Sequence, residues 1–403
     1  ASNHTITAAG NVTQGSFGPF ARPDGEWGVN FDGDDGIKTP ASGVVDFGTG
    51  DFTIEAFFNS NVVDSSNDTI IQNWGGGTGN PVGFAVNRGS SGGIQFYIGS
   101  SLILDTGANA FVANTWNHLA VARSGTSLKM FVNGSVVVTA TNSGNITVGN
   151  SNVSVGYDVQ GTNNYFNGSL SNVRIVKGAA VYTSAFTPAT APLTAITNTQ
   201  LLTCQSNRFV DNSASARTLT LAGNPSVSSF GPFLTTAVYD PAVNGASAYF
   251  DGSDAFLTVS DSADLTPGNT FTFDAWIYPQ ALNNYNTIMS QDGSTGYYWS
   301  ILANGTLQFY TGGGGGSGGT HNSASGVVQL NQWNHVAYSV SGGTGYHFVN
   351  GVRSGSSHSN DIPNIAENLL VGVQKVSSFD LYGYGTDFRL VVGTALYTGS
   401  TYT

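Results

Sequence analysis

The stretch Phe52-Thr53-Ile54-Glu55-Ala56-Phe57 returns later in the chain as Phe271-Thr272-Phe273-Asp274-Ala275-Trp276. In both versions apolar side chains alternate with Thr and an acidic residue. Successive side chains of a β-strand point to opposite faces of the sheet, so this alternation is typical of a strand that packs one face on a core. We therefore expect residues 52–58 and 271–278 to be extended, and the repetition indicates one fold present twice.

Five further motifs recur in the same order, at a spacing of about 215 residues, which is far longer than the period of a solenoid repeat. Their collinear order indicates two tandem modules separated by small loop insertions and deletions. The matching pairs are Phe17–Phe20 with Phe230–Phe233, Phe31–Gly33 with Phe250–Gly252, Trp116–His118 with Trp333–His335, Phe131–Gly134 with Phe348–Gly351, and Val173–Thr183 with Phe388–Thr398.

The repeat also predicts where the modules begin and end. We expect a first module over residues 1–190 and a second over 191–403, joined by an extended linker at Thr187–Thr199, where Pro188 and Pro192 favour a stiff connection. The segment Leu201–Val210 precedes the second Phe-Gly-Pro-Phe motif but has no counterpart before the first. On this comparison we expect the first module to lack its first strand segment and the sequence to be an excerpt of a longer, multi-repeat chain.

Composition favours a β fold rich in turns. Charged residues make up 9% of the chain and aromatic residues 12%, whereas the Glu, Lys, Arg and Gln that cover helical surfaces are scarce. Asn133-Gly134 and Asn350-Gly351 stand between apolar runs and supply the positive φ angles of two-residue hairpins. The fold class predicted is all-β: two tandem antiparallel jelly-roll β-sandwiches.

Charge excludes several classes of partner. The net charge is −12, and the 12 basic residues are dispersed, so neither nucleic-acid binding nor attachment to an anionic membrane surface is expected. No apolar run approaches the ~18 residues of a membrane-spanning helix. A single cysteine, Cys204, rules out an intrachain disulfide and is expected to be a small buried hydrophobe.

Taken as a set, the repeated motifs resemble the laminin-G-like, concanavalin A-like lectin/glucanase superfamily. More narrowly, they are similar to the tandem modules of marine bacteriophage structural proteins and bacterial surface proteins. The resemblance covers nearly the whole chain and implies a curved two-sheet sandwich, in which several family members bind carbohydrate, often with calcium. The cysteine pair of animal laminin-G domains is missing.

Because that superfamily includes glucanases, catalysis has to be considered. Retaining glycoside hydrolysis needs two carboxylates about 5 Å apart. The three glutamates, Glu26, Glu55 and Glu367, do not form the glucanase pattern Glu-x-Asp-x-x-Glu, so the chain is predicted not to be an enzyme. Glu55 with Arg174, and Asp274 with Arg389, are interpreted as structural ion pairs between strands.

The histidines offer no clear metal site. His118 and His335 recur in the Trp-Asn-His motif, and we interpret them as packing residues beside Trp116 and Trp333. The remaining four histidines show no common spacing.

Asp32, Asp34 and Asp35, in the sequence Asp-Gly-Asp-Asp-Gly, could give calcium its oxygen ligands, although a solvent-exposed turn explains them equally well. No other cofactor is expected.

Aromatic residues are the other candidates for binding, since sugar rings stack on aromatic faces. Trp74, Tyr285, Tyr298 and Trp299 are the candidate ligand-binding residues. Because neighbours on a strand face opposite ways, Tyr298 is expected to point away from Tyr297 and Trp299, which places part of this triplet in the core.

The function predicted is that of a non-enzymatic extracellular structural or binding protein. The first reading is a phage virion fibre, appendage or capsid-decoration segment with a glycan-binding role, and the alternative is a carbohydrate-binding adhesin of the bacterial cell surface. The partners expected are a cell-surface glycan, other virion or surface proteins, and copies of the chain itself.

Overall fold

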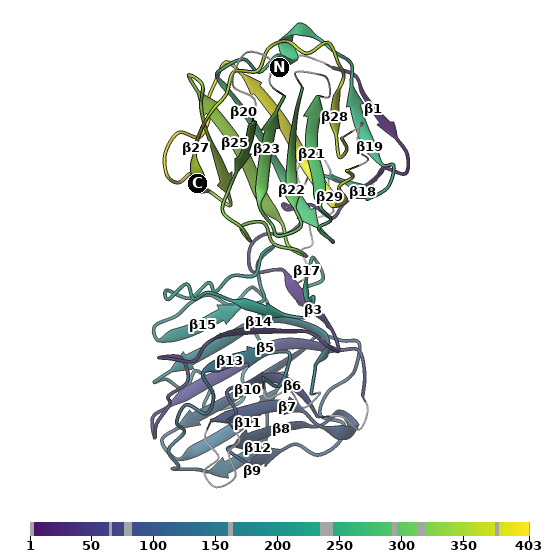
Figure 1. The fold of residues 1–403 in the computed structure, drawn as a ribbon. Helices are drawn as coiled ribbons and strands as arrows, with labels where there is room; N and C mark the ends of the chain where they lie inside the picture. The colour runs from purple at the N-terminus through teal and green to yellow at the C-terminus, as the bar shows by residue number, and fades with distance from the viewer. Residues whose placement is uncertain are drawn as a thin grey trace. The chain divides into compact units, whose positions relative to one another are not determined.

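The computed structural model describes residues 4–63, 67–75, 83–159, 164–233, 245–291, 296–312, 319–374 and 379–402. Regular structure in these ranges consists of β-strands and two short 3-10 turns, at Ser90–Gly92 and Ala263–Leu265. None of the described residues belongs to a helix with the length and apolar character needed to cross a bilayer. Figure 1 shows strands where the alternating stretches predicted them, at β5 (Phe52–Ser60) and β20 (Phe271–Pro279).

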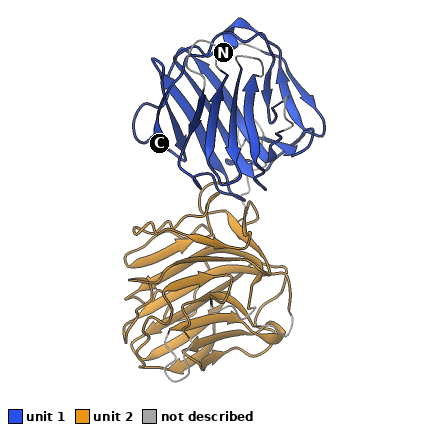
Figure 2. Ribbon diagram, viewed as in Figure 1, with its two compact units in different colours: residues 1–21, 239–403 blue, residues 22–238 orange. Residues whose placement is uncertain are grey.

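The chain forms two compact units (Figure 2). Unit 1 contains residues 1–21 and 239–403, and unit 2 contains residues 22–238. Each unit is built from two antiparallel sheets, which confirms the predicted pair of jelly-roll sandwiches.

In unit 2, the first sheet contains β5 at its centre and the second contains the strands that form the candidate site. The first sheet runs β12 (Ser135–Thr141), β11 (Ser127–Val132), β10 (Asn117–Ser124), β5, β14 (Asn167–Lys177), β3 (Gly28–Asp32) and β17 (Ser226–Ser228), with β15 (Thr199–Thr203) also paired to β14. The second runs β16 (Thr220–Ala222), β4 (Gly36–Pro40), β13 (Asn152–Val155), β6 (Asp68–Gln72), β7 (Phe84–Arg88), β8 (Ile94–Ile98) and β9 (Ser101–Asp105).

Unit 1 repeats this arrangement. Its first sheet runs β2 (Thr13–Gly15), β18 (Ser247–Asp251), β29 (Tyr382–Val392), β20, β25 (Asn334–Ser341), β26 (Thr344–Val349) and β27 (Val352–Ser359). Its second runs β1 (Ile6–Ala9), β19 (Phe256–Val259), β28 (Leu369–Val371), β21 (Tyr285–Gln291), β22 (Tyr297–Leu302), β23 (Leu307–Thr311) and β24 (Gly319–Asn322).

The two hairpins predicted from Asn-Gly are present. Asn133 and Gly134 join β11 to β12 with φ angles of 48° and 79°. Asn350 and Gly351 join β26 to β27 with φ angles of 50° and 83°. Asn and Gly tolerate this left-handed backbone, whereas a β-branched residue would be strained there.

The units divide the chain differently from the expected boundary at residue 190. β15 pairs with β14, β16 with β4 and β17 with β3, so the segment 199–228 completes the sandwich that precedes it. Conversely, β1 pairs with β19 and β2 with β18, so the N-terminal hairpin completes the later sandwich. Among the described strands, it is therefore the later module that lacks a counterpart of β15, because sequence matching gives the order of the repeats but not which unit each segment joins.

Every residue of β5 is buried, although its alternation predicted one inward face. Segments from the later part of the unit cover the outer face: Phe57 packs with Leu193, Leu202 and Phe233. Cys204 follows β15 and is buried, as expected, and burial raises the pKa of its thiol to about 12. A thiol in this state is unreactive at neutral pH.

Candidate functional site

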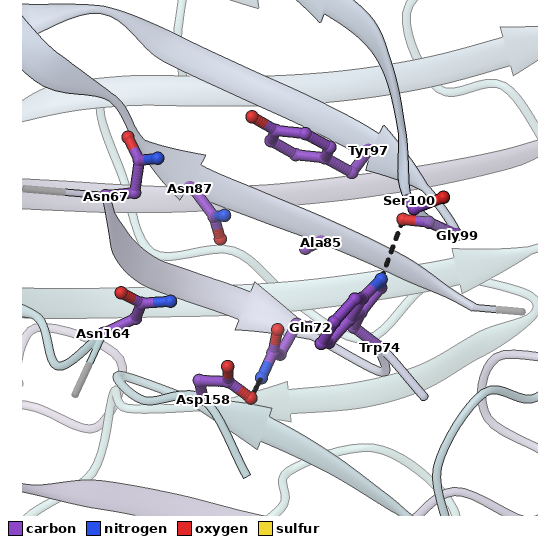
Figure 3. A pocket seen from close by; sticks show the side chains of 10 residues that line it. All are labelled: Asn67, Gln72, Trp74, Ala85, Asn87, Tyr97, Gly99, Ser100, Asp158 and Asn164. Atoms are coloured by element: carbon purple, nitrogen blue, oxygen red, sulfur yellow. Dashed lines mark hydrogen bonds between the residues drawn. The ribbon is translucent and has the colours of Figure 1, made fainter. Parts of the chain in front are cut away.

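A pocket opens on the second sheet of unit 2, on the face away from the core (Figure 3). It is a cavity of about 270 Å³. We call it the amide pocket, because its lining contains four carboxamide side chains: the residues are Asn67, Gln72, Trp74, Ala85, Asn87, Tyr97, Gly99, Ser100, Asp158 and Asn164.

Strand alternation explains how the pocket forms. On β7, Phe84 and Val86 are fully buried, so Ala85 and Asn87 face the pocket. Ala85 pairs with Gln72 on β6 and with Tyr97 on β8, which places these three side chains in one row across the sheet. Because the middle residue of the row is an alanine, a space remains between its larger neighbours.

Hydrogen bonds fix the orientation of the larger side chains. Trp74 Nε1 donates to the Gly99 carbonyl at 2.8 Å, and Gln72 Nε2 donates to Asp158 Oδ1 at 2.7 Å (Figure 3). Trp74 lies at one end of the pocket, and Asn67 and Asn164 at the other. The walls are therefore held in place without a ligand, as in most preformed small-molecule sites.

Asn87 provides a distinctive polar atom. Its Oδ1 is buried and receives no hydrogen bond from the described part of the protein. A buried acceptor without a donor is costly, and such atoms are usually satisfied by water or a ligand. Within the pocket, this oxygen is a natural acceptor for a hydroxyl group.

Unit 1 carries different chemistry at the same positions. Strand register equates Ala85 with Tyr298, which pairs with Ser290 and Tyr310 as Ala85 pairs with Gln72 and Tyr97. The Phe379 carbonyl accepts the amide of Thr287 as the Asn164 carbonyl accepts that of Thr69, so Phe379 takes the place of Asn164.

In unit 1 these aromatic side chains pack on one another. The Tyr298 and Tyr310 rings stack with centroids 4.8 Å apart, and the Tyr285 and Phe379 rings stack at 4.5 Å. Burial is the main cause that raises the pKa of Tyr298 to about 12. We call Tyr285, Tyr298, Tyr310 and Phe379 the aromatic platform. Its rings occupy the space that Ala85 leaves open in unit 2.

The aromatic residues predicted to bind a ligand lie in three different environments. Trp74 lines the amide pocket, and Tyr285 and Tyr298 lie on the platform. The prediction for Trp299 is wrong: it is 0% exposed in the core of unit 1, so its ring cannot reach a ligand. Its neighbour Tyr298 faces outward, as alternation predicted.

Sequence reasoning missed the carboxamides of the pocket. Asn67, Asn87 and Asn164 come from three separate segments in a chain where Asn is common, so no spacing identifies them. The alignment of the two repeats contains a usable signal, because Ala85 aligns with an aromatic residue, Tyr298, of the other copy.

The acidic turn Asp32, Asp34 and Asp35 brings one carboxylate oxygen from each residue within 4.8 Å of the others. Asp35 is buried and accepts the backbone amides of Asp32 at 3.1 Å and Asn224 at 2.6 Å. Burial raises the pKa of Asp35 to about 6, and the hydrogen bond and charge of Asp32 raise the pKa of Asp34. Three oxygens fit part of the calcium coordination shell, which needs six to eight, and Asp35 also ties the turn to residue 224.

The ion pairs expected between strands are present. Glu55 Oε1 lies 2.6 Å from Arg174 Nη2, and Asp274 Oδ2 lies 2.6 Å from Arg389 Nη2. His118 joins the first pair, with Nε2 3.2 Å from Glu55 Oε2, and its ring packs against Phe57. Arg174 and His118 lower the pKa of Glu55 against the opposing effect of its burial, which is the largest single contribution.

Unit 1 also contains a cluster of histidines that the spacing did not reveal. His347 is fully buried, and its Nε2 lies 3.0 Å from the His321 carbonyl oxygen. The His321 and His358 rings lie 4.5 Å apart. Burial lowers the pKa of His347 to about 3 and that of His321 to about 4, so both are neutral at physiological pH.

Comparison with solved structures gives matches of low identity. The chain is similar to domains LG4-5 of the mouse laminin alpha1 chain, with 11% identity, 94% of each chain covered and a TM-score of 0.31. A Bacteroides ovatus ATCC 8483 protein, whose carbohydrate binding is itself only proposed, is 18% identical over 51% of this chain and 60% of its own, with a TM-score of 0.38. The CBM40 of the Ruminococcus gnavus IT-sialidase bound to α2,3-sialyllactose is 18% identical over 38% of this chain and 91% of its own, with a TM-score of 0.32.

No curated protein gave a match to the sequence. A family profile described as the concanavalin A-like lectin/glucanases superfamily matches residues 31–182 and 251–391, which is more than half of the chain and falls once in each repeat. These ranges contain β5 and β20, the Trp-Asn-His and Phe-Val-Asn-Gly motifs of both repeats, and the residues of the amide pocket and of the aromatic platform. The chain therefore belongs to the concanavalin A-like lectin/glucanases superfamily.

Proposed function

We propose that this chain is a non-catalytic carbohydrate-binding protein and that the amide pocket of unit 2 holds the sugar. The observation that carries the proposal is the buried Asn87 Oδ1, which receives no hydrogen bond from the described residues, inside a pocket lined by amides and two aromatic residues. Sugars present many hydroxyl groups and apolar C–H faces. Carboxamides donate and accept hydrogen bonds with the hydroxyl groups, and aromatic rings pack on the C–H faces.

The size and charge of the pocket support a neutral ligand with few sugar rings. Its volume of about 270 Å³ lies just below the range of small-molecule pockets, which begins at about 300 Å³. Asp158 is the one carboxylate among the described lining residues, and it already accepts from Gln72. Glycoside hydrolysis requires a pair of carboxylates on either side of the scissile bond. The arrangement therefore favours binding over hydrolysis.

The test is a glycan array probed with the labelled full chain, the Trp74→Ala variant and a matched Tyr310→Ala variant. Trp74 lines the amide pocket, whereas Tyr310 lies on the aromatic platform. We expect Trp74→Ala to weaken binding at least about tenfold, as loss of an aromatic anchor does, and Tyr310→Ala to leave it unchanged. A broad array without binding above background would overturn the proposal, as would binding that depends on Tyr310 alone.

For the setting of this activity we propose an extracellular surface: a phage virion fibre, appendage or decoration, with a bacterial surface adhesin as the alternative. The abundance of uncharged polar residues and the two repeated modules support a display role. The virion reading predicts extensive contacts between copies of the chain. Sedimentation of the full chain over a concentration series distinguishes the two, since an adhesin segment is expected to remain monomeric.

A further inference from the structure

One edge of unit 1 is open where the matching edge of unit 2 is covered. In unit 2, β14 pairs with β5 on one side and with both β3 and β15 on the other. In unit 1, β29 pairs with β20 and, over Tyr382–Gly385, with β18. No described strand pairs with the rest of that second side, residues 386–392, which we call the open edge. Nine of the eleven residues of β14 are buried, whereas the open-edge residues are partly or fully exposed.

The side chains beside the open edge are already arranged as they are in unit 2. Phe57 and Phe233 of unit 2 meet edge to face at 5.1 Å, and their counterparts Trp276 and Phe20 meet in the same way at 5.6 Å. Exposure differs sharply, because Phe233 is 6% exposed and Phe20 is 50% exposed. In unit 2 the cover consists of Leu193 and Leu202.

The paired arginines show the same contrast. The Arg174 side chain is 5% exposed, and its Nη1 donates to the Thr194 carbonyl oxygen at 2.8 Å. The Arg389 side chain is 52% exposed, although it keeps its partner Asp274. In the part of the chain that the structure describes, unit 1 thus has the ion pair of unit 2 without a backbone segment over its arginine.

Two cavities flank the open edge, one on each face of the sheet. The outer cavity, of about 460 Å³, is lined by Asp274, Trp276, His335, Asp387, Phe388 and Arg389. The inner cavity, of about 670 Å³, has apolar walls that include Met289, Val371 and Leu390. In unit 2, Leu202 pairs with the outward Arg174 and Leu201 with the inward Ile175, so β15 places one leucine on each face. Cross-strand partners share a face, and two adjacent leucines would therefore enter the two cavities.

We infer that the open edge of unit 1 accepts an additional copy of the segment 189–213, supplied by another module of the same kind. The added strand would run antiparallel to β29, as β15 runs antiparallel to β14. Strand addition at a sheet edge obtains affinity from backbone hydrogen bonds and specificity from alternate side chains in pockets. Modules would then be linked by exchange of this segment, which is a low-cost route to assembly.

The test uses the full chain and a synthetic peptide of residues 189–213 that carries a photo-crosslinking group at its N-terminus. We expect saturable one-to-one binding, with crosslinks to residues of β29 or to Phe20. A peptide with Leu201→Asp and Leu202→Asp should bind at least about tenfold more weakly, because it places charges in the two cavities. The Phe20→Ser variant removes an exposed contact without disturbing the core and should also weaken binding.

Two results would overturn the inference. One is crosslinking confined to β14, which would mean that the peptide only replaces β15 in unit 2. The other is equal affinity of the native and the doubly substituted peptide. Circular dichroism of the Phe20→Ser variant shows whether it is folded. The peptide substitutions test binding at the open edge without any change in the protein.

Discussion

Phe233 and Phe20 are the last residues of the two Phe-Gly-Pro-Phe motifs, and their substitution by alanine tests how the units are assembled. Phe233 is 6% exposed and packs with Phe57, Leu193 and Leu202. Burial of this kind makes Phe→Ala cost about 3 kcal/mol, the lower end of the range for core phenylalanines, because the cluster lies near the surface. Phe20 is half exposed, so Phe20→Ala should cost about 1 kcal/mol.

These costs should fall on different units. For domains of this size, 1 kcal/mol corresponds to about 2–4 °C in melting temperature. Phe233→Ala should therefore lower the melting temperature of unit 2 by about 6–12 °C, and Phe20→Ala that of unit 1 by about 2–4 °C. Hydrogen exchange read by mass spectrometry assigns each loss, since peptides from β5 report on unit 2 and peptides from β20 report on unit 1.

The contradictory result is clear. If Phe233→Ala accelerates exchange in β20 and leaves β5 protected, the segment before residue 233 belongs to the later module, as the repeat comparison alone had indicated. The assembly described above would then be wrong.

Three further predictions follow from the site and its surroundings. Ala85→Tyr gives unit 2 the side chain that Tyr298 has at the equivalent position of unit 1, so it should fill the amide pocket and abolish glycan binding on an array, whereas Tyr298→Ala should leave binding intact. Glycan binding by the Ala85→Tyr variant would show that the sugar binds outside the amide pocket. Because burial holds the folded-state pKa of His347 near 3, below the unfolded value of 6.5, its stabilising contribution is complete above pH 6.5 and declines as the pH falls toward 3. At pH 5 this residue alone should cost unit 1 about 2 kcal/mol of unfolding free energy in urea titrations, in addition to the loss from His321, and His347→Phe should remove that part; an unchanged pH dependence in the variant would contradict the assignment. Calcium at about 1 mM should raise the melting temperature of unit 2 at pH 7 and raise it less at pH 5, because Asp35 binds a proton near pH 6; Asp35→Asn should abolish the increase. If calcium leaves the melting temperature of the native chain unchanged, the acidic turn has only a structural role.

Sequence patterns were sufficient for the features that depend on local chemistry. Alternation placed β5 and β20, and the Asn-Gly pairs placed two hairpins. The strand pairing of Glu55 with Arg174 followed from recurrence in both copies, because a buried charge requires a partner. The family was recognisable because its repeated motifs, such as Trp-Asn-His and Phe-Val-Asn-Gly, are short local patterns within the matched ranges.

Features that depend on distant segments were not predictable in this way. No local pattern indicates that β15 joins the sandwich that precedes it or that β1 joins the later one, because backbone hydrogen bonds between strands form with almost any side chains. The amide pocket exists because the side chain of Ala85 is small, and a single alanine in a strand forms no recognisable sequence motif. Trp299 was misjudged because its aromatic character is equally suited to a core and to a sugar-binding surface.

The most direct test of the proposed function is the indole N–H resonance of Trp74 during titration with the glycan that binds most strongly on the array. The chain contains six tryptophans, and single substitutions assign each indole signal. Sugar binding in the amide pocket predicts saturable shifts of the Trp74 indole and of the side-chain amides of Asn67, Asn87 and Asn164. Shifts confined to the resonances of Tyr285, Tyr298 and Tyr310, with Trp74 unmoved, would contradict it.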